Sequence, residues 1–124
     1  MNQDLFDGRT QWYAAFVAGD TQCMAETESA EFIVIANQLV QDRATQIEKI
    51  ATAKRDGHWF PTSSYMQNRR LASHSVTEDV IRVYGTGQIV TAGEKMQVTV
   101  FTELWKHDAS GWYIVHLHYC AMSA

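Results

Sequence analysis

The sequence predicts an α+β fold in which three N-terminal helices pack on one face of a curved antiparallel sheet. Helical periodicity and helix-capping residues occupy the first part of the chain, up to about residue 55. Long stretches rich in β-formers, separated by glycine-containing turns, occupy the rest from about residue 70. Because the helices come first and the long strands last, the two kinds of element are expected to form separate layers.

The first two helices are predicted from periodicity and from the residues that end or begin them. Apolar residues between positions 5 and 17 fall largely on one helical face, and Gly19 is a natural stop after them. Asp20 can then cap a short second helix over residues 21–28.

A small hairpin and a third helix are expected next. The β-branched and aromatic run at residues 32–35 predicts a strand, and Leu39 and Val40 return as its short partner after a turn at residues 37–38. Asp42 can cap a third helix that runs to about Arg55. The inner face of this helix is predicted to carry Ile47, Ile50, Ala51 and Lys54.

The second half of the chain is expected to form the sheet. The aromatic-rich segment 58–68 has no period and is predicted to be a loop. One long strand is predicted over residues 71–84, with a bulge near residues 78–79, before a turn at residues 85–87. Further strands are expected at residues 88–92, 97–107 and 112–121.

Alternation along the last strand assigns its residues to two faces. One face is predicted to carry Trp112, Ile114, His116, His118 and Cys120. The opposite face would carry Tyr113, Val115, Leu117 and Tyr119. Because both faces are substantially apolar, both need a cover, and the helices can cover only one. A homodimer through the other, convex face is therefore expected, using Val98, Val100, Thr102, Leu104, Val115 and Leu117.

Composition narrows the class of protein. The 124 residues, 46% hydrophobic and 19% charged, are expected to form one domain over residues 1–124. A net charge of −4 without a basic cluster argues against a nucleic-acid partner. The longest apolar run, residues 32–36, is too short for a membrane span, and the N-terminus has no secretory pattern. Two cysteines are too few for a disulfide framework, so a cytoplasmic location is expected.

Four stretches carry a resemblance to a known superfamily. They are WYAAFVAGD at residues 12–20, AEFIVIAN at 30–37, VIRVYG at 80–85 and FTELWKHDASGWYIVHLHYC at 101–120. The chain resembles the nuclear transport factor 2-like superfamily, and specifically its SnoaL-like bacterial branch, which includes ketosteroid-isomerase-like proteins. The calcium/calmodulin-dependent kinase association domain closes in a similar way. The resemblance implies a cystatin-like cone, a curved sheet wrapped around three helices with a pocket on the concave side, and dimers or rings through the convex side.

The resemblance also allows a test for ketosteroid isomerase chemistry, which needs a tyrosine, a carboxylate base and a protonated acid. The tyrosine position falls on Trp12, whose indole can donate a hydrogen bond but cannot act as an acid. The base position falls on Ala36, next to Asn37, and neither side chain takes a proton. Only Glu103 keeps its carboxyl group at the third position. Steroid-type isomerisation by the known arrangement is therefore rejected.

Glu103, His116 and His118 are the candidate polar residues of the pocket. The pair of histidines with Cys120 forms a row on one strand, a spacing that zinc sites use, but no further ligand has a recognisable spacing, so no metal and no other cofactor is expected. Glu103 and His118 are the candidate catalytic residues, as acid and base. The ligand-binding residues are expected to be Trp12, Tyr13, Phe16, Phe32, Trp59, Phe101, Glu103, Trp105, His116 and His118.

Three functions remain open at this point. The preferred hypothesis is a domain that binds a small apolar or aromatic molecule in an aromatic pocket. The second is a SnoaL-like cyclase, isomerase or dehydratase that uses Glu103 and His118. The third is a homo-oligomeric association module whose pocket no longer has a role.

Overall fold

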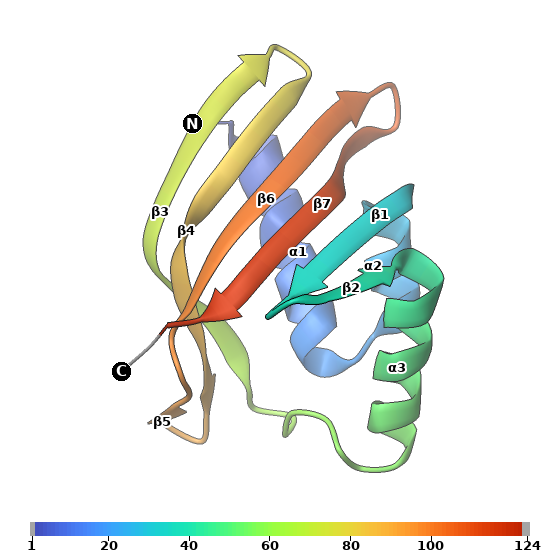
Figure 1. Ribbon diagram of the computed structural model, residues 1–124, viewed down its shortest axis with the longest axis vertical. Coiled ribbons are helices and arrows are strands. Elements are labelled where there is room, and N and C mark those ends of the chain that lie inside the picture. The colour runs from blue at the N-terminus through green and yellow to red at the C-terminus, as the bar shows by residue number, and fades with distance from the viewer. Residues whose placement is uncertain (1, 123–124) are drawn as a thin grey trace.

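The computed structural model describes residues 2–122, which form three helices and one seven-stranded sheet (Figure 1). The helices are α1 (Gln3–Ala18), α2 (Thr21–Thr27) and α3 (Arg43–Arg55). The strands are β1 (Glu28–Ala36), β2 (Leu39–Asp42), β3 (Tyr65–Thr77), β4 (Val80–Thr91), β5 (Glu94–Lys95), β6 (Thr99–Asp108) and β7 (Gly111–Ala121). The predicted α+β class is confirmed. Among the described residues, no helix has the length and apolar character needed to cross a membrane.

The sheet is mixed rather than wholly antiparallel. Its strand order is β2-β1-β7-β6-β4-β3, with β5 paired to β4. Strand β1 runs parallel to β7, whereas all other pairs are antiparallel. A parallel pair needs a long connection between its strands, and here α3 and the rest of the sheet separate β1 from β7 in the chain.

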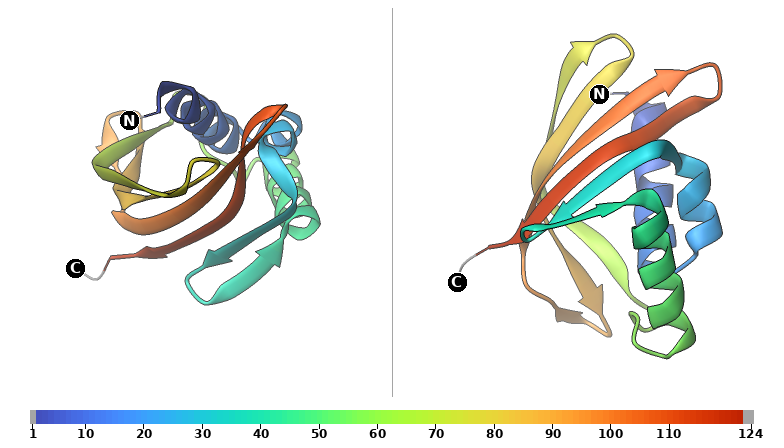
Figure 2. Two further views of the ribbon diagram at one scale, coloured as in Figure 1. Left: turned by 90° about the horizontal axis from the view of Figure 1, so that it is seen from above. Right: turned by 45° about the vertical axis from the view of Figure 1, so that its right-hand side comes forward.

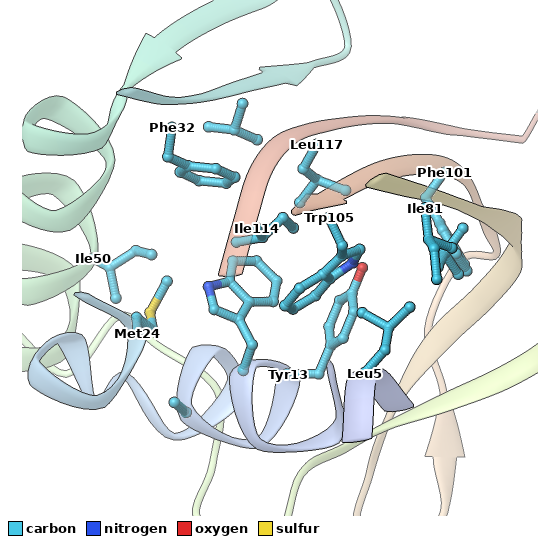
Figure 3. Packing of buried hydrophobic residues seen from close by; sticks show 14 residues of the cluster. Leu5, Tyr13, Met24, Phe32, Ile50, Ile81, Phe101, Trp105, Ile114 and Leu117 are labelled. Atoms are coloured by element: carbon cyan, nitrogen blue, oxygen red, sulfur yellow. The ribbon is translucent and has the colours of Figure 1, made fainter. Parts of the chain in front are cut away.

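The sheet curls around helix α1, which lies against the concave face (Figure 2). Helix α3 lies beyond α1 on the side of β1 and β2 (Figure 1). The core therefore fills the space between the helices and the concave face, as the close-up shows for Leu5, Tyr13, Phe101 and Trp105 (Figure 3).

The helix caps are those that the sequence predicts. The side chain of Asp20 accepts a hydrogen bond from the amide of Cys23 at the start of α2, and Asp42 accepts one from Thr45 at the start of α3. Gly19 ends α1 with φ at 71°, a left-handed conformation that L-residues with a side chain rarely adopt. A Cβ at Gly19 would also lie 3.1 Å from the Trp59 ring, so glycine allows this loop to approach closely.

Three boundaries differ from the predicted ones. Residues 71–84 form parts of two strands, because the chain reverses at Glu78 and Asp79, where a bulge had been expected. Residues 85–87, expected to turn, continue β4, and Gly85 sits so close to the Arg70 carbonyl that a Cβ could not fit there. The expected loop 58–68 is shorter, because β3 begins at Tyr65.

A β-bulge reverses the predicted faces of the second half of β7. Leu104 pairs with His116 and Trp105 with Ile114, so Val115 is the extra residue. Before the bulge Ile114 faces the core, and after it Leu117 and Tyr119 do so. One inserted residue shifts the alternation and turns every later side chain to the other face.

The bulge corrects the predicted faces of several residues of β7. His116 and His118 pair with Leu104 and Thr102 on the convex side, and His118 is exposed. The placement of both histidines on the pocket face is therefore wrong. Leu117, expected on the convex face, is only 3% exposed and belongs to the core.

Candidate functional site

A buried ion pair links helix α1 to the middle of the sheet. Glu103 on β6 is completely buried, and Arg9 on α1 is 2% exposed. The Arg9 Nε atom lies 2.8 Å from Oε1 of Glu103, and Nη2 lies 2.9 Å from Oε2. This two-pronged geometry is the one in which a guanidinium binds a carboxylate most strongly.

Two further donors complete the surroundings of Glu103. The Tyr13 hydroxyl donates to Oε2 at 2.6 Å, and the Trp105 indole nitrogen donates to Oε1 at 2.8 Å. Figure 3 shows this hydroxyl and this indole nitrogen close together in the core. Burial, and then the Glu103 charge, hold the pKa of Tyr13 well above its usual value, so its hydroxyl stays protonated and donates.

Arg9 is satisfied by its surroundings as well. Its Nη1 atom donates to Oδ1 of Asn68 at 3.0 Å. The guanidinium carbon lies 4.7 Å from the centre of the Tyr13 ring and 5.0 Å from that of Phe101. Aromatic faces on both contacts favour a cation there, which offsets part of the cost of burial.

Glu103 therefore cannot act with His118 as an acid–base pair. Both carboxylate oxygens of Glu103 already accept two or more hydrogen bonds from the chain. His118 points to the opposite face of the sheet. The predicted pair is separated by the sheet itself, because the bulge at Val115 turns His118 outward.

Two cavities lie between the helices and the concave face. The first has a volume of about 170 Å³ and the second about 300 Å³. Four residues line both: Trp12, Phe16, Leu117 and Tyr119. The first is completed by Tyr13, Phe60, Met66, Gln88, Ile89, Gln97, Thr99 and Phe101. The second is completed by Val34, Gln41, Gln46, Lys49, Ile50, Ala53 and Trp59. The two cavities adjoin across the shared residues.

Aromatic residues of α1 and of the loop that follows α3 form an aromatic wall that lines these cavities. The rings of Trp12 and Phe16 stack with their centres 5.6 Å apart, and Trp59 meets Phe16 edge-on at 5.3 Å. The Trp59 indole also donates to the Phe16 carbonyl at 2.8 Å, which caps the free end of α1. Phe60 extends the wall beside Trp59.

The predicted site residues divide into three groups. Five of them line a cavity: Trp12, Tyr13, Phe16, Trp59 and Phe101. Three lie within the packed core instead: Phe32, Glu103 and Trp105. The last two, His116 and His118, face the convex side.

Several residues of the site were not predicted. Arg9 lies four residues after Leu5 and four before Tyr13, so helical spacing alone places it on the buried face of α1. Tyr119 was assigned to the wrong face because the bulge is not visible in the alternation. On α3 the buried residues are Gln46 and Ile50. Ala51 and Lys54, which the sequence predicts on the inner face, are exposed.

A second buried carboxylate lies at the start of β1. Glu28 is 6% exposed, and its Oε2 atom accepts a hydrogen bond from the Trp12 indole at 3.0 Å. Arg43 approaches its Oε1 atom only to 3.8 Å. Burial raises the pKa of Glu28 from 4.5 to about 7, while Trp12, Arg43 and Gln46 oppose that shift.

The described residues offer no grouping of three or more histidine, cysteine, aspartate or glutamate side chains that could hold a metal ion. Of the two cysteines, Cys23 is half-buried and Cys120 is exposed, and both are free thiols.

No protein-family model and no curated protein matches the sequence. Solved structures match it closely in shape. A protein of unknown function with a cystatin-like fold from Nostoc punctiforme has a TM-score of 0.79 at 6% identity, over 98% of this chain and 91% of that one. A protein from Pseudomonas putida described as NTF2-like has a TM-score of 0.78 at 10% identity, over 98% of this chain and 87% of that one. The chain has the nuclear transport factor 2-like fold.

Other proteins with this fold are described by different functions. A candidate dehydratase of the NTF2-like family from Streptomyces avermitilis has a TM-score of 0.79 at 17% identity, over 98% of this chain and 96% of that one. A candidate calcium/calmodulin-dependent protein kinase II association domain from Xanthomonas campestris has a TM-score of 0.74 at 16% identity, over 97% of this chain and 84% of that one. Similarity at these identities establishes the NTF2-like fold alone, and function has to be argued from the site.

Replacement of Arg9 by methionine is expected to destabilise the fold by about 3–5 kcal/mol, because it leaves the Glu103 carboxylate buried without its cation. Urea denaturation measures this loss. Arg82→Met on the exposed side of β4 is the matched control and is expected to change stability by about 0.5 kcal/mol or less. Equal effects of the two substitutions would contradict the role assigned to the ion pair.

Glu28 is expected to make stability fall as pH rises. Because its pKa is about 7 in the folded chain and 4.5 is the ordinary value, the folded state binds this proton more tightly. The contribution of this proton to the free energy of unfolding is complete below about pH 4.5 and is lost as pH rises through 7, by about 3 kcal/mol. Urea denaturation at pH 5 and pH 8 should show this loss in the wild type and not in Glu28→Gln. The same pH dependence in both proteins would show that Glu28 does not titrate there.

Proposed function

We propose that the protein binds a small, mostly apolar molecule in the two adjoining cavities on the concave face. The observation that carries this proposal is the set of four residues shared by both cavities, Trp12, Phe16, Leu117 and Tyr119. Through these residues the two cavities share one mostly apolar surface. Such a surface is typical of sites that take small molecules, where a few polar groups fix the orientation.

The size and polarity of the cavities support binding. The second cavity, at about 300 Å³, reaches the lower end of the range for small-molecule sites. The lining is mostly apolar, and its polar side chains include Gln88 and Gln97 in the first cavity and Gln46 and Lys49 in the second. Burial raises the pKa of Tyr119, so its hydroxyl stays protonated and can donate to a ligand.

Binding is favoured over proton-transfer catalysis by what the titratable groups already do. Glu103 is fully engaged with Arg9, Tyr13 and Trp105, so it has no free acceptor for a substrate proton. A cyclase, isomerase or dehydratase that used Glu103 and His118 would need both on one face. Binding requires only the shared apolar surface of the cavities and a few hydrogen-bond partners.

Tyr119→Ala is expected to weaken binding of 1-methoxynaphthalene about tenfold, because it removes an aromatic contact common to both cavities. Isothermal titration calorimetry measures the change. Tyr84→Ala is the matched control, since Tyr84 is 42% exposed and pairs with Thr102 on the convex side of the sheet. The proposal fails if the wild type does not bind this probe at millimolar concentration, or if both variants bind it equally.

Self-association through the convex face is a second candidate function, compatible with the first. Tyr84 and Val100 are each 42% exposed there, and Leu104 lies on the same side. The structural similarity to a candidate association domain also supports it. Exposed apolar side chains on one face favour burial against the same face of a second chain, as in a symmetric homodimer.

The expected mass in solution at micromolar concentration is therefore that of two chains. Val100→Glu should shift it toward one chain, because a charge in an apolar interface is desolvated without a partner. Met96→Glu serves as the control, since Met96 is 50% exposed and lies outside the convex-face ladder. Light scattering after size exclusion measures the masses, and a monomeric wild type would disprove this association.

A further inference from the structure

Gln46 is a buried polar side chain that lines the second cavity. It lies on α3, one turn before Ile50, and both side chains face inward. The residue is only 4% exposed, yet none of the described residues donates a hydrogen bond to its Oε1 atom. A buried amide oxygen without a donor is destabilising, and most buried polar atoms in proteins are paired.

The neighbouring carboxylate fixes which way the Gln46 amide faces. Gln46 lies close enough to Glu28 to favour the ionised form of that carboxylate, as a donating amide N–H does. Above pH 7, where Glu28 is ionised, the opposite orientation would place the amide oxygen against carboxylate oxygens, and two acceptors repel each other. The Gln46 nitrogen therefore belongs on the side of Glu28, and Oε1 is left for another donor.

The unpaired acceptor selects the kind of group that can face it. The Oε1 atom of Glu28 also has no hydrogen-bond donor among residues 2–122, and its nearest cation, Arg43, lies 3.8 Å away and is partly exposed. Glu28 is not among the residues that line the cavity, whereas Gln46 is. The charged residue that lines the cavity is Lys49, which is exposed to solvent. A hydroxyl or ammonium group can donate to the Gln46 oxygen, and an ionised carboxylate cannot, because it has no hydrogen to donate.

We infer that the molecule bound in the second cavity carries a hydrogen-bond donor, a hydroxyl or a protonated amine, which Gln46 Oε1 accepts while its apolar body rests on Trp12, Phe16 and Tyr119. This inference rests on the proposed binding function and adds the class of ligand to it. It predicts alcohols, phenols and amines of naphthalene size as ligands, and it disfavours acids of the same size.

The test compares two probes that differ in one donor, 1-naphthol and 1-methoxynaphthalene, by isothermal titration calorimetry on the full chain. The wild type is expected to bind 1-naphthol at least about tenfold more tightly, since only 1-naphthol can pair the buried acceptor. Gln46→Met, which keeps the length of the side chain and removes the acceptor, should abolish the preference.

Gln11→Met is the control. Gln11 makes the same chemical change possible on α1, but its side chain is exposed and lines neither cavity. This variant should keep the preference for 1-naphthol. A second measurement does not depend on any variant folding: 1-naphthol should shift the side-chain amide resonances of Gln46 in the wild type more than 1-methoxynaphthalene does.

The outcomes separate this inference from the proposed function. Equal affinity of the wild type for both probes would overturn the donor assignment and leave the binding function standing. A preference that survives in Gln46→Met, or tighter binding of 1-naphthoate than of 1-naphthol, would overturn it as well. Failure of the wild type to bind any of the three probes would contradict both proposals.

Discussion

The architecture depends on one buried interaction, the pairing of Arg9 on α1 with Glu103 on β6. Neither charge can be left alone in the core, because an unpaired buried charge costs several kcal/mol. The two-pronged geometry therefore restricts how α1 can rotate and slide on the concave face. With Arg9 held in place, helical spacing places Trp12 and Phe16 where they line both cavities. Tyr13 completes the pairing and borders the first cavity, so one side chain joins the structural network to the candidate site.

The same network explains why a carboxylate in an aromatic core does not indicate catalysis here. Glu103 was a reasonable catalytic candidate, because a carboxyl group among aromatic side chains is costly and such groups cluster at active sites. The buried Glu103 carboxylate is stabilised by the Arg9 guanidinium and by two neutral donors, Tyr13 and Trp105. Glu28 is the contrasting case. Burial raises its pKa to about 7, because one close donor and a cation at 3.8 Å offset only part of that effect. Beside it the Gln46 oxygen has no donor among the described residues.

Capping and turn residues act on their neighbours in sequence, so the elements that depend on them could be predicted. The features that were not predicted depend on pairing between residues far apart in the chain. The helix caps Asp20 and Asp42 and the αL residue Gly19 depend on neighbours in sequence, and all three are where the sequence predicts them. The parallel pairing of β1 with β7 depends on residues far apart in the chain and was missed. The bulge at Val115 was missed because apolar residues occupy both faces of β7, so the pattern looks equally good in either register. That single residue decides whether His118 or Tyr119 faces the concave side. Arg9 was recognisable from its place on the apolar stripe of α1, whereas the meeting of Glu28 with Gln46 requires the three-dimensional fold.

The central claim is that the concave face of this NTF2-like fold receives an apolar molecule, and the four tryptophans report on it directly. Trp12 and Trp59 line the cavities, Trp105 is buried against Glu103, and Trp112 lies at the far end of β7 beside His107. Titration of the ¹⁵N-labelled protein with 1-methoxynaphthalene, followed through the four indole N–H resonances, separates these positions. The account predicts the largest shifts for Trp12 and Trp59 and almost none for Trp112. Shifts that are largest at Trp112, or absent from all four indoles at millimolar probe, would contradict it.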